Sequence, residues 1–458
     1  MGYPQVTPAS TRILFGVTGV GSTDFPHPVF KITYGNLDLS GIIPDMNQNR
    51  DHYDVAVVGG GAAGLFAAIF AGRAGQRVLV LDGAKKLGAK ILVAGGGRCN
   101  VTHHAVDPAD YAGDKPNRIR KVLRRFDVTD TIEFFREQGV ELKREETGKL
   151  FPVTDKARSV LDALLNACNQ AGVTLAHPQR VETLERREND FLISGDWGSV
   201  SADRVILATG GRALPKSGSD GHGYSIAESL GHRISDRVFP ALVPLILPGE
   251  HPLRELSGVS FDGTLTVRAP GGKILHHTTH SILCTHFGLS GPGILDISRH
   301  WRDGIEDDVG TTLDVDFMPQ VSQEDLDQAL QQAGSKTPRS ILRQWLSDRM
   351  SDTLIALSGI DGQSPCAQLA KNDRKNLLQA CKQYVLPVQG DRGYTYAEVT
   401  MGGVPLEEVD LKTMASRKTP GLSLVGEILD VDGRIGGFNF QWAWATGFIA
   451  GSSTVSTS

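Results

Sequence analysis

The segment 54–71 constrains the fold of this chain more than any other part of the sequence. Residues 54–58 are almost entirely apolar, which is typical of a central strand in a parallel sheet that is covered on both faces. The stretch 59–64, GGGAAG, follows at once and leads into small and apolar residues that predict a helix. Its glycine spacing matches the dinucleotide-binding fingerprint: a tight turn, a close approach of pyrophosphate to the backbone, and close packing of helix on strand. The predicted phosphate-binding residues are Gly59, Gly61, Ala62, Ala63 and Gly64.

A second apolar strand, 78–81, ends at Asp82, 18 residues after Gly64. A carboxylate at this point of a βαβ unit accepts hydrogen bonds from an adenosine ribose. The glycine spacing alone is weak evidence, because it also occurs in plain glycine-rich turns. The order strand, fingerprint, helix, strand and acid favours a dinucleotide site.

Composition limits the class of protein. The chain has 458 residues, 40% hydrophobic and 22% charged, which suits a globular protein of two or three domains. A formal net charge of −5 argues against binding nucleic acid through overall charge. The five cysteines form no Cys-x-x-Cys pair, and no apolar run reaches the ~18 residues that span a bilayer. We therefore expect a cytoplasmic protein with reduced cysteines.

Residues 1–50 differ from the rest of the chain. They are rich in Gly, Pro, Asp and Asn and show no sustained period, so we expect an irregular N-terminal extension. Met46 lies eight residues before Asp54. We expect translation to start at Met46 and residues 1–45 to be an upstream reading.

A glycine-rich loop at 95–100 helps to decide which dinucleotide binds. Three consecutive glycines before Arg-Cys-Asn suit a backbone that passes close to a flat or charged group, although a mobile surface loop is the alternative. An ordinary NAD dehydrogenase requires no such loop here, whereas the far end of the longer FAD needs covering. The predicted cofactor-binding residues in this loop are Gly97, Arg98, Cys99 and Asn100, of which Arg98 is also a candidate substrate contact.

The C-terminal segment 421–450 repeats the order of strand, acid, glycine pair and helix. Glu427 is placed to bond a ribityl hydroxyl, and the amides after Gly436 can face the pyrimidine carbonyl of a flavin. Two such motifs at opposite ends of the chain suit one extended cofactor, which favours FAD. The predicted cofactor-binding residues are Gly426, Glu427, Asp430, Gly436, Gly437, Phe438 and Asn439.

These motifs resemble the BaiN/RdsA family of FAD-dependent oxidoreductases, whose members act on 3-dehydro bile acids, on aminoacetone or on a ribosomal RNA uridine. The resemblance runs from about residue 52 to the C-terminus through the segments GGGAAGL, KKLGAKILVAGGGRCNVT, KLFPVTDKA, ATGG, THFGLSGP and GEILDVDGRIGGFNFQWAWATG. It implies that the strand ending at Thr209 and Gly210 returns to the FAD, and that Val181 holds the adenine through main-chain groups. His286, within THFGLSGP, is a candidate substrate contact.

The middle of the chain changes its periodicity. Residues 264–267 and 311–317 alternate with period two, as in half-buried antiparallel strands, whereas 323–386 have a helical period. We expect an α/β protein with a split Rossmann-type FAD-binding domain, an inserted β-barrel-like subdomain and a helical subdomain. The predicted boundaries are 1–50 for the extension, 51–241 for the first part of the FAD-binding domain, 242–320 for the β-rich subdomain, 321–388 for the helical subdomain and 389–458 for the second part of the FAD-binding domain.

Two further patterns each have a structural and a functional interpretation. The histidine-rich run 276–286 invites a metal site, but alternate strand residues point to opposite faces and no carboxylate completes a ligand set, so we expect no metal. The run 115–125 holds six basic residues in eleven. It is typical of a solvated helix face, and the alternative is a patch that contacts RNA or phosphate.

The sequence thus predicts an FAD-dependent oxidoreductase that transfers a hydride between flavin N5 and a small unsaturated or carbonyl substrate. Because no second complete fingerprint is present, NADH or NADPH would dock transiently as reductant. The alternatives are a flavin-dependent RNA-modifying reductase that saturates a pyrimidine, and a flavin-binding redox-sensing protein. The catalytic residues stay unassigned. Cys99 is expected to shape its loop only, because no resolving cysteine accompanies it.

Overall fold

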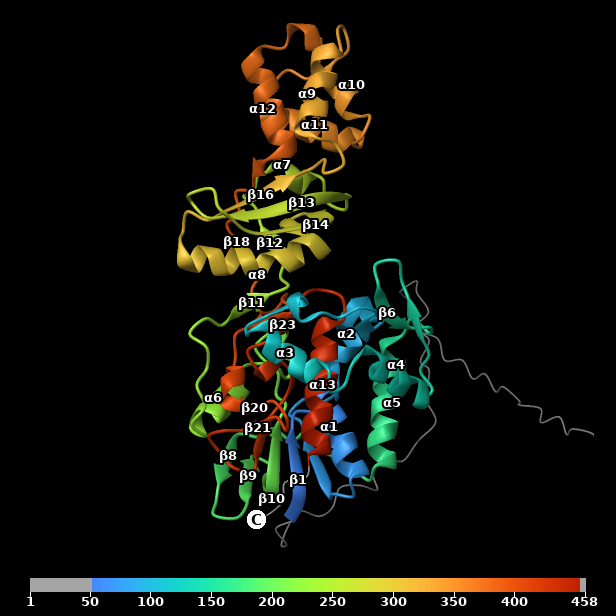
Figure 1. Cartoon of the computed structure of the whole chain (residues 1–458), viewed down its shortest axis with the longest axis vertical. Coiled ribbons are helices and arrows are strands. Elements are labelled where there is room, and N and C mark those ends of the chain that lie inside the picture. The colour runs from blue at the N-terminus through green and yellow to red at the C-terminus, as the bar shows by residue number, and fades with distance from the viewer. Residues whose placement is uncertain (1–51, 454–458) are drawn as a thin grey trace, which may run out of the picture. The chain divides into compact units, whose positions relative to one another are not determined.

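The structure is a computed structural model that describes residues 52–453 (Figure 1). The expectations for residues 1–50, including the start at Met46, lie outside the described residues. None of the described helices is long and apolar enough to cross a membrane.

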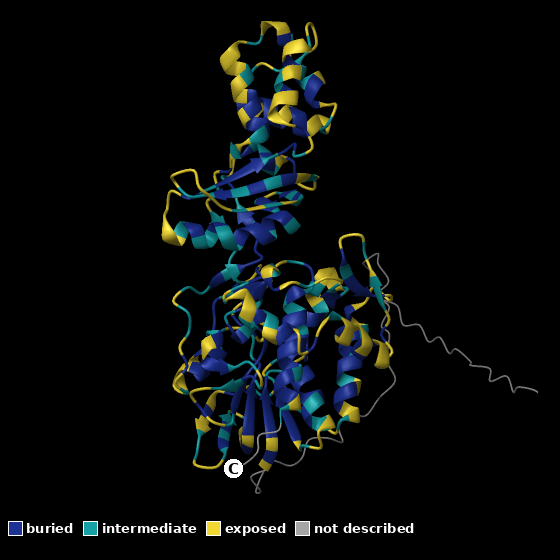
Figure 2. Cartoon of the chain, in the orientation of Figure 1, coloured by how far each residue is buried: buried dark blue, intermediate teal, exposed yellow. Residues whose placement is uncertain are grey.

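A parallel sheet forms the centre of the FAD-binding region. Its parallel strands lie in the order β22 (Leu422–Leu424), β10 (Gly198–Leu207), β1 (His52–Val58), β2 (Val78–Leu81) and β7 (Thr174–Ala176). Figure 2 shows the middle of this sheet buried, in agreement with the apolar character of β1 and β2, whereas β7 at its edge is only half-buried. The Rossmann-type α/β fold is confirmed. Four antiparallel strands extend this sheet: β20 (Val409–Asp410), β21 (Ala415–Ser416), β8 (Thr183–Arg186) and β9 (Phe191–Gly195).

Two helices that begin at the two glycine motifs pack against each other. They are α1 (Ala62–Arg73) and α13 (Phe438–Ser452), the latter drawn in red beside α1 in Figure 1. Glycines of α13 allow the close approach, since a Cβ on Gly447 would lie 2.7 Å from the Ala63 carbonyl oxygen and one on Gly451 would lie 2.3 Å from that of Ala67. The two ends of the described chain therefore share one core.

The connections between β2 and β10 carry most of the remaining helices of this region. They comprise α2 (Ala89–Gly97), β3 (Thr102–His103), β4 (Tyr111–Ala112), α3 (Pro116–Leu123), α4 (Val128–Glu137), β5 (Leu142–Arg144), β6 (Lys149–Pro152) and α5 (Ala157–Gln170). Downstream lie α6 (His222–Ser229), β23 (Asp432–Gly433) and the pair β11 (Phe239–Ala241) and β19 (Val399–Met401).

A second, antiparallel sheet has its own hydrophobic core. Its strands lie in the order β17 (Tyr384–Val385), β16 (Thr312–Asp316), β13 (Ser260–Arg268), β14 (Ile274–Thr285), β15 (Gly288–Ser290), β12 (Leu245–Ile246) and β18 (Gly390–Asp391). This order has two ends, so the pairing does not close the sheet into a complete barrel. Two further helices pack with it, α7 (Pro252–Glu255) and α8 (Pro292–Asp307).

Four helices follow β16: α9 (Gln323–Gln332), α10 (Pro338–Leu342), α11 (Asp348–Ser358) and α12 (Lys371–Lys382). Within the predicted helical stretch 323–386, α10 and α11 are separate helices, because Ser347 caps the start of α11 by accepting from the Met350 amide. Pro365 precedes a single 3₁₀ turn, Cys366–Gln368. The domain boundaries at 242, 321 and 389 stay predictions.

Candidate active site

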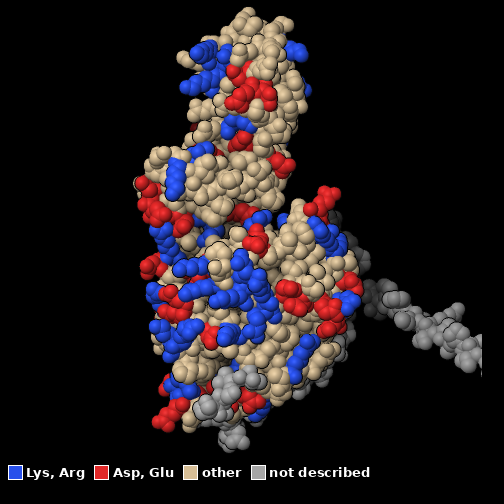
Figure 3. All heavy atoms as spheres, in the orientation of Figure 1, with Lys and Arg blue, Asp and Glu red and all other residues tan. Residues whose placement is uncertain are grey.

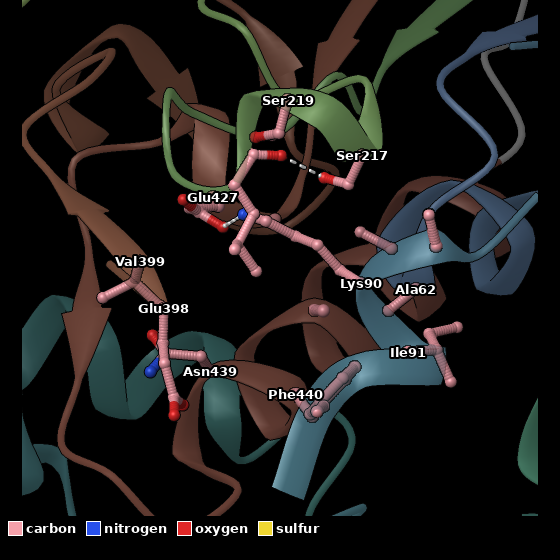
Figure 4. A pocket seen from close by; sticks show the side chains of 18 of the residues that line it. Ala62, Lys90, Ile91, Ser217, Ser219, Glu398, Val399, Glu427, Asn439 and Phe440 are labelled. Carbon is pink, nitrogen blue, oxygen red and sulfur yellow. Dashed lines mark hydrogen bonds and ion pairs between the residues drawn. The ribbon is translucent and has the colours of Figure 1, made fainter. Parts of the chain in front are cut away.

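A cavity of about 670 Å³ brings the two glycine motifs together (Figure 4). Its walls come from the turn between β1 and α1, from α2, from the loop after β10, from the segment before β19 and from the start of α13. The predicted cofactor-binding residues that line it are Gly59, Gly61, Ala62, Ala63, Asp82, Arg98, Asn100, Val181, Thr209, Gly210, Gly426, Glu427, Gly436, Gly437 and Asn439.

The three fingerprint glycines have three different surroundings. A Cβ on Gly59, which has φ +108°, would lie 2.4 Å from the Ala208 carbonyl oxygen, and one on Gly64 would lie 1.9 Å from the Gly59 carbonyl oxygen. No atom lies within 4 Å of the position of a Cβ on Gly61, which borders the cavity. Gly59 and Gly64 are therefore required by packing, whereas a side chain on Gly61 would fill space in the pocket.

Two helix N-termini meet the cavity. The residues that precede α1 and α13 are Gly61 and Gly437, and neither helix has a side-chain cap. The first amides of a helix lack partners within the helix and carry partial positive charge. The pocket thus offers two sets of amide donors to oxygen atoms of a ligand, as the pyrophosphate and a flavin carbonyl would require.

Asp82 holds the turn that follows β2. One carboxylate oxygen accepts from the Gly60 amide at 2.6 Å and the other accepts from the Ala84 amide at 2.7 Å. Burial raises the pKa of this carboxyl group, while both hydrogen bonds act in the opposite direction. Its expected contact with a ribose stays a prediction.

Glu427 has protein partners on both carboxylate oxygens. One oxygen accepts from the Thr400 amide at 3.0 Å, and the other forms a 2.7 Å ion pair with Lys90 Nζ. Figure 4 shows the Lys90 side chain reaching from α2 to Glu427. The bond from Glu427 to a ribityl hydroxyl stays a prediction. Sequence reasoning missed Lys90, although it lies in the KKLGAK segment.

The glycine-rich loop contributes to the pocket one cation and one side-chain amide whose oxygen has no hydrogen-bond partner. Arg98 pairs with Glu145 at 2.6 Å and stacks 4.0 Å above the Phe151 ring. The Oδ1 atom of Asn100 is buried without a hydrogen-bond partner, and so is Oγ of Ser219 on the loop after β10. Buried polar atoms normally have partners, so both indicate a polar ligand in this cavity.

Cys99 is fully buried in the same loop, at φ +61°, and does not line the cavity. Burial raises the pKa of its thiol to about 12. Asp430 bonds to the Ser235 hydroxyl and Phe438 stacks on His103, and neither faces the pocket. Gly64 and Gly97 are also outside the lining.

The structure places His286 away from the cavity lining, and its expected role as a substrate contact stays a prediction. This residue is exposed on the turn between β14 and β15, its carbonyl oxygen accepts from Arg254, and it does not line the pocket. Its neighbour Phe287 is linked to the pocket instead: the Arg392 guanidinium lies 4.2 Å from the Phe287 ring and 3.4 Å from the ring of Tyr396, which lines the cavity.

One part of the cavity is apolar and was not predicted. Leu242, Leu295 and Ile435 form it, and Val93 and Pro292 line the cavity as well. Leu295 and Ile435 pack on the small cluster of Ala241, Leu242 and Val399. A carboxylate from Glu398 borders the cavity as well. These positions carry no sequence motif of their own, and only the fold brings them together.

Among residues 52–453, no group of three or more His, Cys, Asp or Glu side chains could hold a metal ion.

Comparisons with known proteins agree with this geometry. The family model for the HI0933-like protein Rossmann domain matches residues 53–453. The chain belongs to this family. It is 37% identical over 403 residues to the 3-dehydro-bile acid delta(4,6)-reductase of Clostridium scindens, covering 87% of this chain and 98% of the relative. It is 34% identical over 401 residues to the ribosomal RNA dihydrouridine synthase of Escherichia coli, covering 86% of this chain and 96% of the relative.

A solved 3-ketosteroid delta1-dehydrogenase from Sterolibacterium denitrificans shares 14% identity at a TM-score of 0.47, covering 87% of this chain and 98% of that one, a likeness too low to bear on function. The family member described here is an FAD-dependent oxidoreductase. Its pocket fits that cofactor. Gly61 leaves space beside the phosphate-binding turn, and the uncapped N-termini of α1 and α13 face the cavity. The buried polar atoms of Asn100 and Ser219 have no hydrogen-bond partner among the described residues.

Proposed function

We propose that this FAD-dependent oxidoreductase reduces a carbon–carbon double bond conjugated to a carbonyl group in a small, mostly apolar substrate. The observation that carries the proposal is the apolar section of the cavity, which shares one space with the cofactor-binding turns. A ligand pocket of mainly apolar walls with a few directed polar groups suits such a substrate. The Clostridium scindens relative, which this chain matches over nearly its full length, is named for a delta(4,6)-reduction of 3-dehydro bile acids.

FAD supplies the redox chemistry when it is bound, since its reduced ring is a hydride donor. The chain supplies binding and electrostatics. Amides at the start of α1 would hold the pyrophosphate, with Asp82 holding the turn opposite. The start of α13 directs partial positive charge into the pocket, which stabilises negative charge that develops there. Leu242, Leu295 and Ile435 exclude water from the substrate.

We propose NADH or NADPH as the reductant, docking transiently at the mouth of the pocket. The absence of a second fingerprint in the sequence supports transient docking rather than a resident domain. Anaerobic bleaching of the flavin absorbance by each nucleotide tests this. A protein that is reduced by dithionite but by neither nucleotide would require a different electron donor.

The substrate class is tested with the reduced holoprotein under anaerobic conditions. The flavin is mixed with a 3-oxo-4-ene steroid, 2-cyclohexenone, aminoacetone and oxygen in separate single turnovers. We expect the two enones to restore the oxidised spectrum and to yield the saturated ketone. Reoxidation by aminoacetone or oxygen with none by either enone would contradict the proposed substrate class.

A second candidate function is reduction of a pyrimidine in RNA, as in the Escherichia coli relative named above. The helix α3 favours it, because its apolar residues are buried while Lys121, Arg124 and Arg125 are exposed and make no ion pair among the described residues. Figure 3 shows Lys and Arg gathered over this helix. RNA binding that weakens steeply with salt, and that is lost on replacing these three residues by alanine, would support this function.

A further inference from the structure

Glu398 points into the pocket from a segment whose neighbours point into the core. Ala397 is fully buried against Ala213 and Val243, and Val399 is 4% exposed and packs on Ala241 and Leu242. The side chain of Glu398, between them, is accessible and borders the cavity. Alternation of this kind is what an extended backbone dictates. Figure 4 shows Glu398 next to Val399 on the wall of the pocket.

The backbone at Glu398 is held on both sides. Its own amide donates to the Leu242 carbonyl at 3.2 Å, and Val399 pairs with Ala241 in the β11–β19 ladder. Thr400 is held at two groups: its amide donates to Glu427 at 3.0 Å, and its hydroxyl oxygen accepts from the amides of Arg212 and Ala213 at 2.7 and 3.0 Å. The carboxyl group of Glu398 is therefore carried on a rigid support.

This carboxyl group makes no hydrogen bond or ion pair within the part of the chain that the structure describes. Its oxygens are therefore available to a ligand in the cavity. Three charged groups act on it from three elements: Lys149 of β6 and Lys90 of α2 favour the carboxylate, and Asp296 of α8 favours the acid. Although the side chain of Glu398 is exposed to the open cavity, the surrounding walls are the largest influence on its carboxyl group, and they raise its pKa to about 7. Both protonation states are then populated near neutral pH, as general acid–base catalysis requires.

We propose that Glu398 is the proton donor of the reduction. The inference rests on the proposed function, since it needs an enone as substrate and reduced flavin as hydride source. The carbon β to the substrate carbonyl receives the hydride and forms a C–H bond, and the electron pair of the double bond moves to the α carbon and carbonyl. The Glu398 O–H bond then breaks, its proton forms the new bond at the α carbon, and the resulting carboxylate takes a proton from water. The product is the saturated ketone.

The first test needs no turnover. The visible spectrum of bound oxidised FAD responds to nearby charge, so we expect it to titrate with pH near 7 in the wild-type holoprotein. Glu398→Gln should bind FAD fully and lose this titration. Glu407→Gln is the matched control, because Glu407 is an exposed carboxylate paired with Arg233 on the surface, and its spectrum should titrate as in the wild type. Loss of FAD from Glu398→Gln, or an unchanged titration, would contradict the placement of this carboxyl group beside the flavin.

The second test is anaerobic reoxidation of the reduced holoprotein by 2-cyclohexenone or a 3-oxo-4-ene steroid. Glu398→Gln should slow reoxidation by about 10²–10⁴-fold, the range typical of a lost general acid. The wild-type rate should fall as pH rises through about 7, and this dependence should vanish in the variant. Glu398→Asp should restore part of the rate. Glutamine still donates a hydrogen bond, so a merely anchoring residue would tolerate it with a small loss.

Different experimental outcomes would contradict the proton-donor role of Glu398 and the proposed function. If the wild-type protein reoxidises with the enone and Glu398→Gln does so within about threefold at every pH, the proton-donor role is wrong and the proposed function stands. If the wild-type protein does not react with either enone, the proposed function is wrong and the proton-donor role fails with it.

Discussion

Lys90 and Glu427 lie 337 positions apart in the sequence, and their side chains form a 2.7 Å ion pair at the cavity. The second oxygen of Glu427 accepts from the Thr400 amide, so one carboxylate ties α2, the C-terminal motif and β19 together. The side chain of Lys90 is 25% exposed and that of Glu427 is 18% exposed. The pair fixes the positions of three segments that border the proposed flavin site.

Removing either partner should weaken FAD binding. Lys90→Met leaves the Glu427 carboxylate without its cation, and Glu427→Gln leaves the Lys90 ammonium group without its anion. We expect each change to lower FAD affinity by about tenfold, or about 1.4 kcal/mol. The double variant should cost clearly less than the two single changes together, because only one pair is lost. FAD titration by fluorescence quenching measures this, with Arg136→Met as the control, since its pair with Glu133 is exposed. Additive losses would mean that the pair does not act as a unit.

Gly61→Val should give folded protein without FAD. Nothing occupies the space beside Gly61 except the cavity, so the added side chain blocks the ligand and meets no protein atom. We expect FAD affinity to fall by at least about 100-fold while the far-ultraviolet circular dichroism stays unchanged. Gly271→Val is the control, because Gly271 is equally open and distant from the cavity lining. Full flavin occupancy in Gly61→Val would refute the assignment of this turn.

Sequence patterns located the cofactor turn because its chemistry is local. Gly59, Gly61 and Asp82 from the first motif and Gly426, Glu427, Gly436 and Gly437 from the last all line one cavity, whereas Gly64 and Asp430 do not. Glu398 and Lys90 carry no such local signal, since their positions depend on long-range packing. His286 lies within a family motif, but the turn between β14 and β15 exposes it outside the cavity lining, so its role stays a prediction.

Cys99 should be dispensable for redox chemistry. Its thiol is fully buried and its pKa is raised to about 12, so the reactive thiolate is nearly absent at neutral pH. We expect Cys99→Ser to keep FAD and its reduction by dithionite, and iodoacetamide to leave the native thiol unmodified. A long-wavelength charge-transfer band on partial reduction that disappears in Cys99→Ser, together with loss of turnover, would show thiol participation.

Asp296 should make stability depend on pH in a defined direction. Burial raises the pKa of this carboxyl group to about 6, against an ordinary value of 3.8, although the Ile435 amide donates to it at 2.6 Å. At pH values between these two pKa values, the Asp296 carboxyl group is protonated more in the folded protein than in the unfolded chain. The contribution of Asp296 to the free energy of unfolding therefore falls as pH rises from about 4 to 6. Asp296→Asn should therefore gain stability relative to the wild type over that window, by about 3 kcal/mol at most.

Urea denaturation at saturating FAD measures the difference between the two proteins across this range of pH. Asp352→Asn is the contrasting control. The hydrogen bond from Arg339 lowers the pKa of Asp352, so the contribution of Asp352 to the free energy of unfolding is lost as pH falls. A difference between Asp296→Asn and the wild type that stays constant from pH 4 to 8 would contradict the raised pKa.

A single anaerobic turnover tests whether one cavity of this protein holds FAD beside an enone. Holoprotein is reduced with one equivalent of dithionite and mixed with a 3-oxo-4-ene steroid while the flavin absorbance is recorded. We predict full recovery of the oxidised spectrum with one equivalent of saturated ketone formed per flavin. A flavin that stays reduced in the presence of the steroid and of 2-cyclohexenone, and is reoxidised only when oxygen is admitted, would contradict it.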